Sequence, residues 1–139
     1  MSIAKLPSTL DSILVRTDFS DENAWSLALA VATAVNEDGF QAYVRVVDDP
    51  IFENMKWQDI SEQVLILENH AAVLFIADEA ALLNDYPIQV VDLSGGARQP
   101  FRCIARELWG VENNLNTGNM DWSDFADNVD SDGVFRKFA

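Results

Sequence analysis

Short apolar runs in this chain alternate with segments in which apolar residues recur at helical spacing. The runs are rich in β-branched residues and predict five strands, at 12–18, 42–48, 72–77, 88–93 and 101–105. Between the first two runs, residues 21–36 are apolar except for one narrow polar stripe. That pattern predicts a helix that is mostly buried against a sheet.

Three further segments show helical periodicity. In residues 57–68, Ile60, Val64 and Leu67 fit one face of a helix, although the apolar run within the segment would also fit a strand; we prefer the helix. Residues 79–84 allow about one to two helical turns. The tail repeats apolar residues at the i, i+3, i+4 and i+7 positions of a helix, namely Trp122, Phe125, Ala126 and Val129.

These elements predict an α/β fold with one domain over residues 1–139, because no repeat or Gly/Ser-rich linker divides the chain. Strands that alternate with helices favour parallel pairing. Only the short SGGARQP loop separates the last two strands, so they should form an antiparallel hairpin. We therefore expect a small, mostly parallel central sheet with an antiparallel edge hairpin and helices packed on it.

Composition indicates a cytoplasmic protein. With 49% hydrophobic residues, the 139-residue chain can form a core. No apolar run approaches the roughly 18 residues of a membrane span, and the N-terminus lacks the pattern of a signal peptide. The single cysteine, Cys103, allows no internal disulfide, which agrees with a reducing compartment.

The net charge is −14, from 23 acidic and 9 basic side chains. Such a surface repels nucleic acid and anionic membranes, so neither is an expected partner. It attracts basic proteins and speeds the encounter with them, although solubility alone would also explain the charge. No basic residue lies between Arg106 and Arg136. The candidate partner-binding residues are the aspartates of that segment: Asp121, Asp124, Asp127, Asp130 and Asp132.

The sequence NVDSDGVF, residues 128–135, has the spacing that opens a calcium loop, with oxygen ligands at 128, 130 and 132 and then Gly133. The loop would start with the neutral Asn128. Its twelfth position, which should be a bidentate glutamate, is Ala139, the last residue. We therefore expect a turn after a helix, with Phe135 and Phe138 folded back onto the core.

A second group of acids suggests a different chemistry. Asp18, Asp48, Asp78 and Asp92 lie at or near the carboxyl ends of four predicted strands. In open α/β sheets ligands bind at that edge, and converging carboxylates hold Mg²⁺ in enzymes that transfer or cleave phosphoryl groups. Helix capping and turn formation would also place aspartates there.

Other catalytic constellations are weaker. Cys103 and His70 are the only cysteine and histidine, which makes a zinc site improbable and leaves one conceivable Cys–His pair. Cys103 lies within an apolar strand, where a cysteine is usually an inert small hydrophobe. The glycines of SGGAR lack the Lys-Ser/Thr of a phosphate-binding loop. No cofactor is expected.

Several segments resemble those of an uncharacterised bacterial protein family, a domain of unknown function. They are RTDFSDENAW (16–25), VVDL (90–93) followed by FR at 101–102, and NMDWSDFADNVDSDGVFRKF (119–138). The resemblance spans most of the chain. It implies a bacterial source and a compact domain, and it assigns no catalytic or binding residue.

The favoured function is a non-catalytic acidic protein that docks a basic protein partner, such as a toxin to be neutralised or a protein that binds DNA. The alternative is a Mg²⁺-dependent phosphoryl-transfer or phosphate-cleaving enzyme. A third possibility is a domain that assembles with itself; the sequence does not define the oligomeric state.

Overall fold

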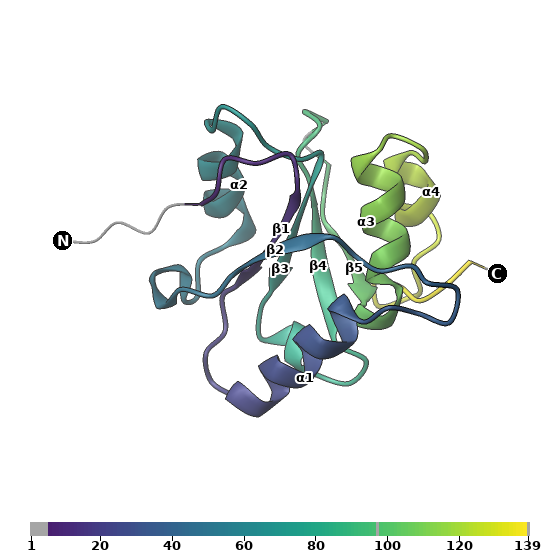
Figure 1. Ribbon diagram of the computed structural model, residues 1–139, viewed down its shortest axis with the longest axis horizontal. Coiled ribbons are helices and arrows are strands. Elements are labelled where there is room, and N and C mark those ends of the chain that lie inside the picture. The colour runs from purple at the N-terminus through teal and green to yellow at the C-terminus, as the bar shows by residue number, and fades with distance from the viewer. Residues whose placement is uncertain (1–5, 97, 139) are drawn as a thin grey trace.

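A computed structural model describes residues 6–96 and 98–138. The strands are β1 (Ser12–Arg16), β2 (Val44–Val47), β3 (Val73–Ala77), β4 (Pro87–Asp92), β5 (Phe101–Ile104) and β6 (Val134–Phe135). The α-helices are α1 (Glu22–Thr33), α2 (Trp57–Leu65), α3 (Leu108–Asn116) and α4 (Trp122–Ala126). Three 3₁₀ turns complete the elements: η1 (Pro50–Phe52), η2 (Ala80–Leu82) and η3 (Ala105–Glu107). Figure 1 shows their arrangement.

The strands form one six-stranded mixed sheet in the order β2-β1-β3-β4-β5-β6. β1 pairs in parallel with β2 and β3, and β5 pairs in parallel with β6. The expected antiparallel hairpin of β4 and β5 is confirmed, and so is the α/β fold with a mostly parallel sheet. β3 and β4 are also antiparallel, which the sequence did not indicate. Their connection contains only the turn η2, and that is too short for a parallel crossover.

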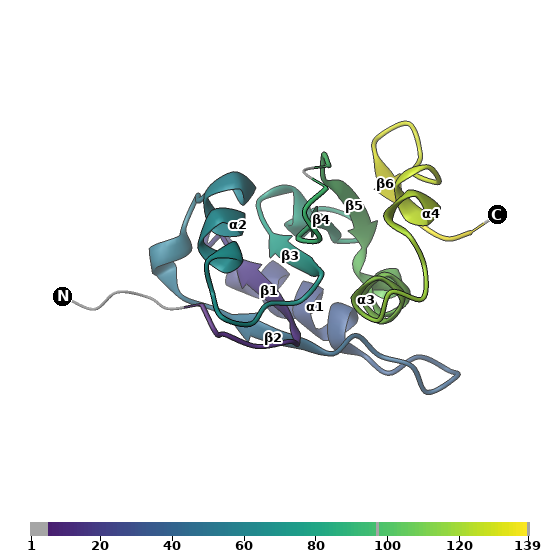
Figure 2. The same cartoon turned by 90° about the horizontal axis from the view of Figure 1, so that it is seen from above.

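Helices cover both faces of the sheet (Figure 2). Side chains alternate between the faces along each strand, so Leu14 and Phe75 pack with α1, α3 and α4, while Ile13 and Leu74 pack with α2. Because helices cover both faces, the side chains on each side of β1 and β3 are buried, and both strands are buried along their whole length. The alternation also creates two separate core clusters, one on each side of the sheet.

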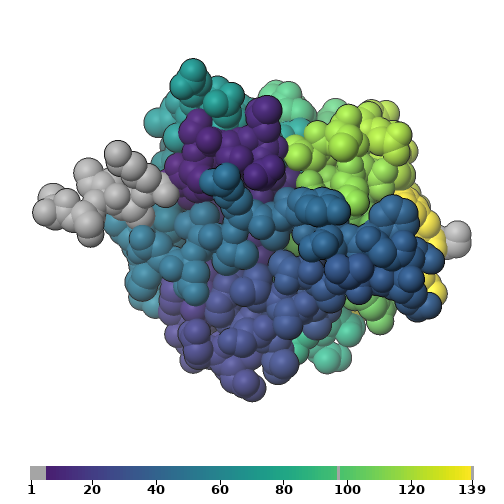
Figure 3. Space-filling model, in the orientation of Figure 1, coloured from purple at the N-terminus to yellow at the C-terminus, as the bar shows by residue number. Residues whose placement is uncertain are grey.

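Helix α1 is less buried than the sequence predicts. Its carboxylate cap is Asp21, which accepts a hydrogen bond from the backbone N of Ala24 at 3.0 Å. Trp25 and Ala28 are buried, but Leu27 and Val31 are 49% and 38% exposed. The helices on this face of the sheet form one layer. The side of α1 that points away from the sheet therefore faces solvent, and its apolar residues are exposed. Figure 3 shows α1 and the segment that leads to β2 on this surface.

Helix α3 has no counterpart among the predicted elements. It buries Leu108, Val111 and Leu115 on the sheet. Glu112, on the same helix, is only 3% exposed, and its carboxylate accepts hydrogen bonds from Ser12 Oγ at 3.1 Å and from the backbone N of Tyr43 at 2.9 Å. This carboxylate therefore connects α3 to the first strand and to the segment before β2.

The tail forms part of the domain. Trp122 and Phe125 of α4 are buried, and β6 places Phe135 in the same cluster. Phe138 is 47% exposed but lies 5.3 Å from Phe125, measured between ring centroids. The expected return of the tail onto the core is thus confirmed. In the described part of the chain, every helix is too short or too polar to cross a bilayer.

Candidate functional site

The carboxyl ends of β1 and β3 form the crevice at which ligands bind in open α/β sheets. The chain passes from β1 to β2 on one side and later returns to β3 on the other side of β1, so the strand order reverses there. A cavity of about 350 Å³ lies at this point. We call it the switch-point cavity. Asp18, Asp78 and Lys56 contribute to its lining.

The four strand-end aspartates do not form one cluster. Asp92 pairs in register with Val73, the first residue of β3, whereas Asp78 follows the last residue of β3. The two aspartates therefore lie at opposite ends of the strands. The antiparallel direction of β4 causes this separation. No group of three or more His, Cys, Asp or Glu side chains in residues 6–96 and 98–138 has a geometry suited to a metal ion. The expectation that all four carboxylates converge is therefore wrong.

The three aspartates at the expected edge each have local partners. Asp18 Oδ1 accepts a hydrogen bond from the backbone N of Ser20 at 2.9 Å. Asp78 receives two bonds from Arg102, at 2.8 and 2.6 Å. Asp48 lies 3.2 Å from the Nη1 of Arg16. These contacts account for the three side chains by turn formation and ion pairing.

Arg16 is a buried cation at the carboxyl end of β1, and it contacts both acidic and aromatic side chains there. It is 2% exposed, and its Nη2 lies 2.7 Å from Glu22 Oε2. Its guanidinium also stacks over the rings of Phe19 and Trp25, at 4.3 and 5.1 Å from their centroids. Arg16 thus joins β1 to the start of α1, and its charge is already neutralised by carboxylates.

The tail aspartates divide into two groups. Asp130 is built into the turn before β6: its carboxylate accepts hydrogen bonds from the backbone N atoms of Asp132 and Val134 and from Arg136 Nε at 2.7 Å. The hydrogen bond from Arg136 is the main cause that lowers the pKa of Asp130. The other four, which we call the acidic tail surface, are exposed: Asp121, Asp124, Asp127 and Asp132.

The calcium-loop spacing is explained by this same turn. Gly133 has a φ of 78°, the left-handed conformation that a side chain disfavours, and the chain then enters the strand β6 instead of a second helix. Asp130, the third position of the loop, uses both carboxylate oxygens within the protein. The twelfth position, Ala139, lies outside the described residues.

The cysteine and histidine have separate environments. Cys103 is completely buried in β5, and burial, followed by the negative charge of Glu107, raises the pKa of its thiol well above the usual value. His70 precedes β3, and its Nδ1 lies 2.8 Å from the carbonyl oxygen of Ala71. The thiolate that nucleophilic catalysis needs is therefore disfavoured at Cys103.

A second cavity lies at the edge of the sheet where Asp92 is found. Its volume is about 400 Å³, and we call it the Asp92 cavity. Asp92 and Arg98 contribute from the end of β4 and the following loop, and Asn116, Asp121 and Trp122 from the ends of α3 and α4. Two segments quoted for the family resemblance, 90–93 and 119–138, thus meet here. The sequence grouped Asp92 with the wrong aspartates because the direction of β4 was not known.

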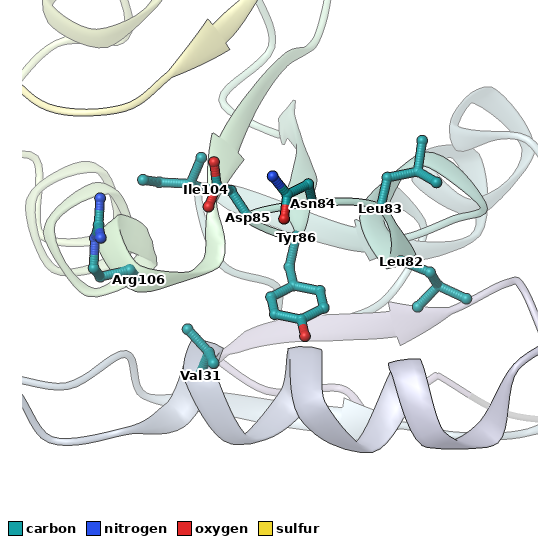
Figure 4. Close-up of a pocket in the computed structure, with 8 residues that line it drawn as sticks. All are labelled: Val31, Leu82, Leu83, Asn84, Asp85, Tyr86, Ile104 and Arg106. Carbon is teal, nitrogen blue, oxygen red and sulfur yellow. The ribbon is translucent and has the colours of Figure 1, made fainter.

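A third cavity, of about 400 Å³, lies between α1 and the turn before β4 (Figure 4). Its lining is mixed, because apolar residues such as Val31 and Leu82 lie beside the polar Asn84, Asp85 and Arg106. Asp85 and Tyr86 have positive φ values of 66° and 51°, which are strained for residues with side chains. Their conformation lets the backbone N of Ala105 bond to the Tyr86 carbonyl at 3.0 Å. No sequence pattern indicated this turn.

A family model described as Domain of unknown function (DUF6924) matches residues 11–138, almost the whole chain. No curated protein gives a significant match.

Proposed function

The chain belongs to the DUF6924 family, and we propose that it is a non-catalytic binding protein whose acidic tail surface docks a basic protein partner. One observation carries this proposal. The carboxylates of Asp121, Asp124, Asp127 and Asp132 are exposed and form no ion pair with any residue in 6–96 or 98–138. They are free to pair with the lysines and arginines of another protein.

The rest of the charge distribution supports this choice of surface. Elsewhere the arginines are used inside the protein: Arg16, Arg102 and Arg136 each pair with an aspartate. The segment 107–135 contains no basic residue, so its own charged side chains are all negative, and Arg136 from outside it pairs with Asp130 alone of its aspartates. The field of these negative side chains steers a basic protein toward this side of the molecule and raises the rate of encounter.

The acidic tail surface also has a rigid base. Trp122 lies edge-on to Phe101, with ring centroids 4.8 Å apart, and Phe125 contacts Phe135 in the same way at 5.1 Å. Asp124 accepts a hydrogen bond from the backbone N of Asp121 at 2.8 Å, which fixes the start of α4. Carboxylates held in this way lose little conformational entropy when a partner binds.

Neutralising the acidic tail surface should weaken the partner's binding about 30-fold. The variant carries Asp121→Asn, Asp124→Asn, Asp127→Asn and Asp132→Asn. Four exposed pairs at about 0.5 kcal/mol each amount to about 2 kcal/mol, which is the stated change in affinity. The measurement is capture of partners from an extract of the source organism, followed by titration of the captured protein against the wild type and the variant.

The matched control removes the same number of charges from other exposed positions. Glu37→Gln, Glu53→Gln, Glu62→Gln and Glu68→Gln also leave the protein four charges less negative. This variant should bind within about twofold of the wild type, because distant exposed charges are screened by salt. Equal losses in the two variants would show a general charge effect and would sink the proposal, as would capture of no partner.

A Mg²⁺-dependent phosphoryl-transfer or phosphate-cleaving enzyme is the second candidate. The switch-point cavity favours it, because Asp18 and Asp78 both contribute to a hollow where α/β proteins bind ligands. Lys56 lies in the same cavity and would offer a positive charge to a phosphate. Against it stands the bidentate contact of Asp78 with Arg102, which a metal ion would have to displace.

A melting experiment separates the two candidates. We expect the melting temperature in millimolar Ca²⁺, Mg²⁺ or Mn²⁺ to equal that in EDTA at matched ionic strength. A site saturated 100-fold would add about 2.7 kcal/mol and raise the melting temperature by about 5–10 °C. A rise of that size with Mg²⁺ or Mn²⁺, abolished by Asp18→Asn, would favour the enzyme.

A further inference from the structure

Asp92 is a buried carboxylate with one oxygen that lacks a hydrogen bond. Its side chain is 3% exposed. The Oδ1 atom accepts a hydrogen bond from the backbone N of Ser94 at 2.9 Å. The Oδ2 atom has no hydrogen-bond partner among the residues that the structure describes, and its closest cationic atom, Arg98 Nη1, is 3.7 Å away. Since a buried carboxylate oxygen without a donor is costly, the unsatisfied Oδ2 calls for an explanation, although Oδ1 also accepts from the Ser94 hydroxyl.

The surroundings of Asp92 favour a cation with hydrogen-bond donors. A second carboxylate, Asp121, lines the same cavity, and so does Asn116 at the carboxyl end of α3. That helix has nine residues and no basic residue in its last turn, so its partial negative charge is not compensated within the helix. Trp122 adds an aromatic surface against which the aliphatic part of a long side chain can pack.

We propose that the Asp92 cavity receives one lysine or arginine side chain of the basic partner, whose charged end bonds to Asp92 Oδ2. The proposal rests on the proposed function, and it defines where a single basic residue of that partner is seated. The acidic tail surface adjoins the cavity through Asp121, which belongs to both. A partner held by the tail carboxylates would thus present its side chains at the cavity.

Arg98 lies near the place proposed for the partner's basic side chain, but it interacts only weakly with Asp92. Its side chain is 53% exposed, and the 3.7 Å between its Nη1 and Asp92 Oδ2 is too long for a hydrogen bond. Gly96 leaves space beside Asp92 Oδ2 for the incoming side chain, because a Cβ at position 96 would lie only 2.9 Å from that oxygen. Binding exchanges the distant Arg98 for a donor in direct contact with the carboxylate.

The test uses the full chain and a capped tripeptide with lysine at its centre, titrated by isothermal calorimetry. An otherwise identical peptide with norleucine in place of lysine reports on apolar contacts alone. Asp92→Asn should weaken lysine-peptide binding about 30-fold, because the charge that receives the ammonium group is gone. Gly96→Ala should give a similar loss without changing the net charge, and circular dichroism confirms that each variant is folded.

Arg98→Ala provides a change of opposite sign. Removal of the competing guanidinium should tighten lysine-peptide binding about fivefold. Arg45→Ala is the matched control, since Arg45 is also exposed and pairs with a carboxylate, Asp11, at 3.5 Å. This control should alter the affinity by less than about twofold, which a screened surface charge would cause.

The results separate this inference from the proposed function. Absent binding of the lysine peptide, equal binding of the norleucine peptide, or unchanged affinity in Asp92→Asn would overturn the inference. Weaker binding in Arg98→Ala would also overturn it, because Arg98 would then support peptide binding instead of competing with the lysine for Asp92. If the lysine peptide binds as expected while the tail variant keeps its partner, the Asp92 cavity binds a basic side chain but the proposed docking surface fails.

Discussion

Replacing Phe125 with alanine is expected to lower the free energy of unfolding by about 3–5 kcal/mol, the loss usual for a buried phenylalanine. Phe125 is 1% exposed, and its ring contacts those of Phe135 and Phe138 at centroid distances of 5.1 and 5.3 Å. The change would leave a cavity beneath the acidic tail surface. Urea denaturation followed by tryptophan fluorescence measures the loss.

Phe138→Ala is the control for this prediction. Phe138 belongs to the same aromatic group but is 47% exposed, so its removal should cost only about 1 kcal/mol. A loss below about 1 kcal/mol for Phe125→Ala, outside the range for buried phenylalanines, would mean that the tail does not share the core of the domain. The base of the proposed docking surface would then be missing.

Glu112→Ala should destabilise the protein by about 3 kcal/mol, because it leaves the buried Ser12 hydroxyl and the partly buried Tyr43 N–H without their acceptor. The loss exceeds that of an ordinary exposed glutamate because Glu112 is 3% exposed and joins α3 to β1 and to the segment before β2. Chemical denaturation of the two proteins at the same pH measures the difference.

Glu112→Gln refines this result. The amide keeps the shape: its oxygen can accept the bond from the Tyr43 N–H, and its NH₂ group can donate to the Ser12 hydroxyl. Both bonds then lose only the strengthening by the charge, so the loss should be about 1 kcal/mol. Glu62→Ala, at an exposed position on α2, should change stability by less than about 0.5 kcal/mol. If all three variants were equally stable, the hydrogen bonds of Glu112 would not contribute to the fold.

The sequence predicted β1 to β5 because their apolar runs are distinct, but it did not reveal α3 or the two-residue strand β6. Residues 108–116 contain Gly110 and the three asparagines Asn113, Asn114 and Asn116, all weak helix formers. The helix forms because Leu108, Val111 and Leu115 are buried on the sheet, which is tertiary information. Propensity alone could not show it.

The candidate sites depended on strand direction, which the sequence did not determine. The alternation of strands and helices predicts a parallel direction for β4, which would place Asp92 at the same end of the strands as Asp78. Because β4 is antiparallel to β3, Asp92 lies at the other end of the strands. There it lines the same cavity as Asp121, which is 29 positions later in the chain. The acidic tail surface was easier to predict, because charge and helical spacing are properties of a local segment.

The most direct test of the account is to map the partner's contacts by nuclear magnetic resonance. The isotope-labelled protein would be titrated with the partner that the wild-type chain captures, and the shifts of its backbone amides recorded. We expect the largest shifts at residues 119–132, which include the acidic tail surface, and at Asp92, Ser94 and Arg98, which line the Asp92 cavity. Shifts confined to α1 and the strained turn at Asp85 and Tyr86, with the tail unaffected, would contradict the account.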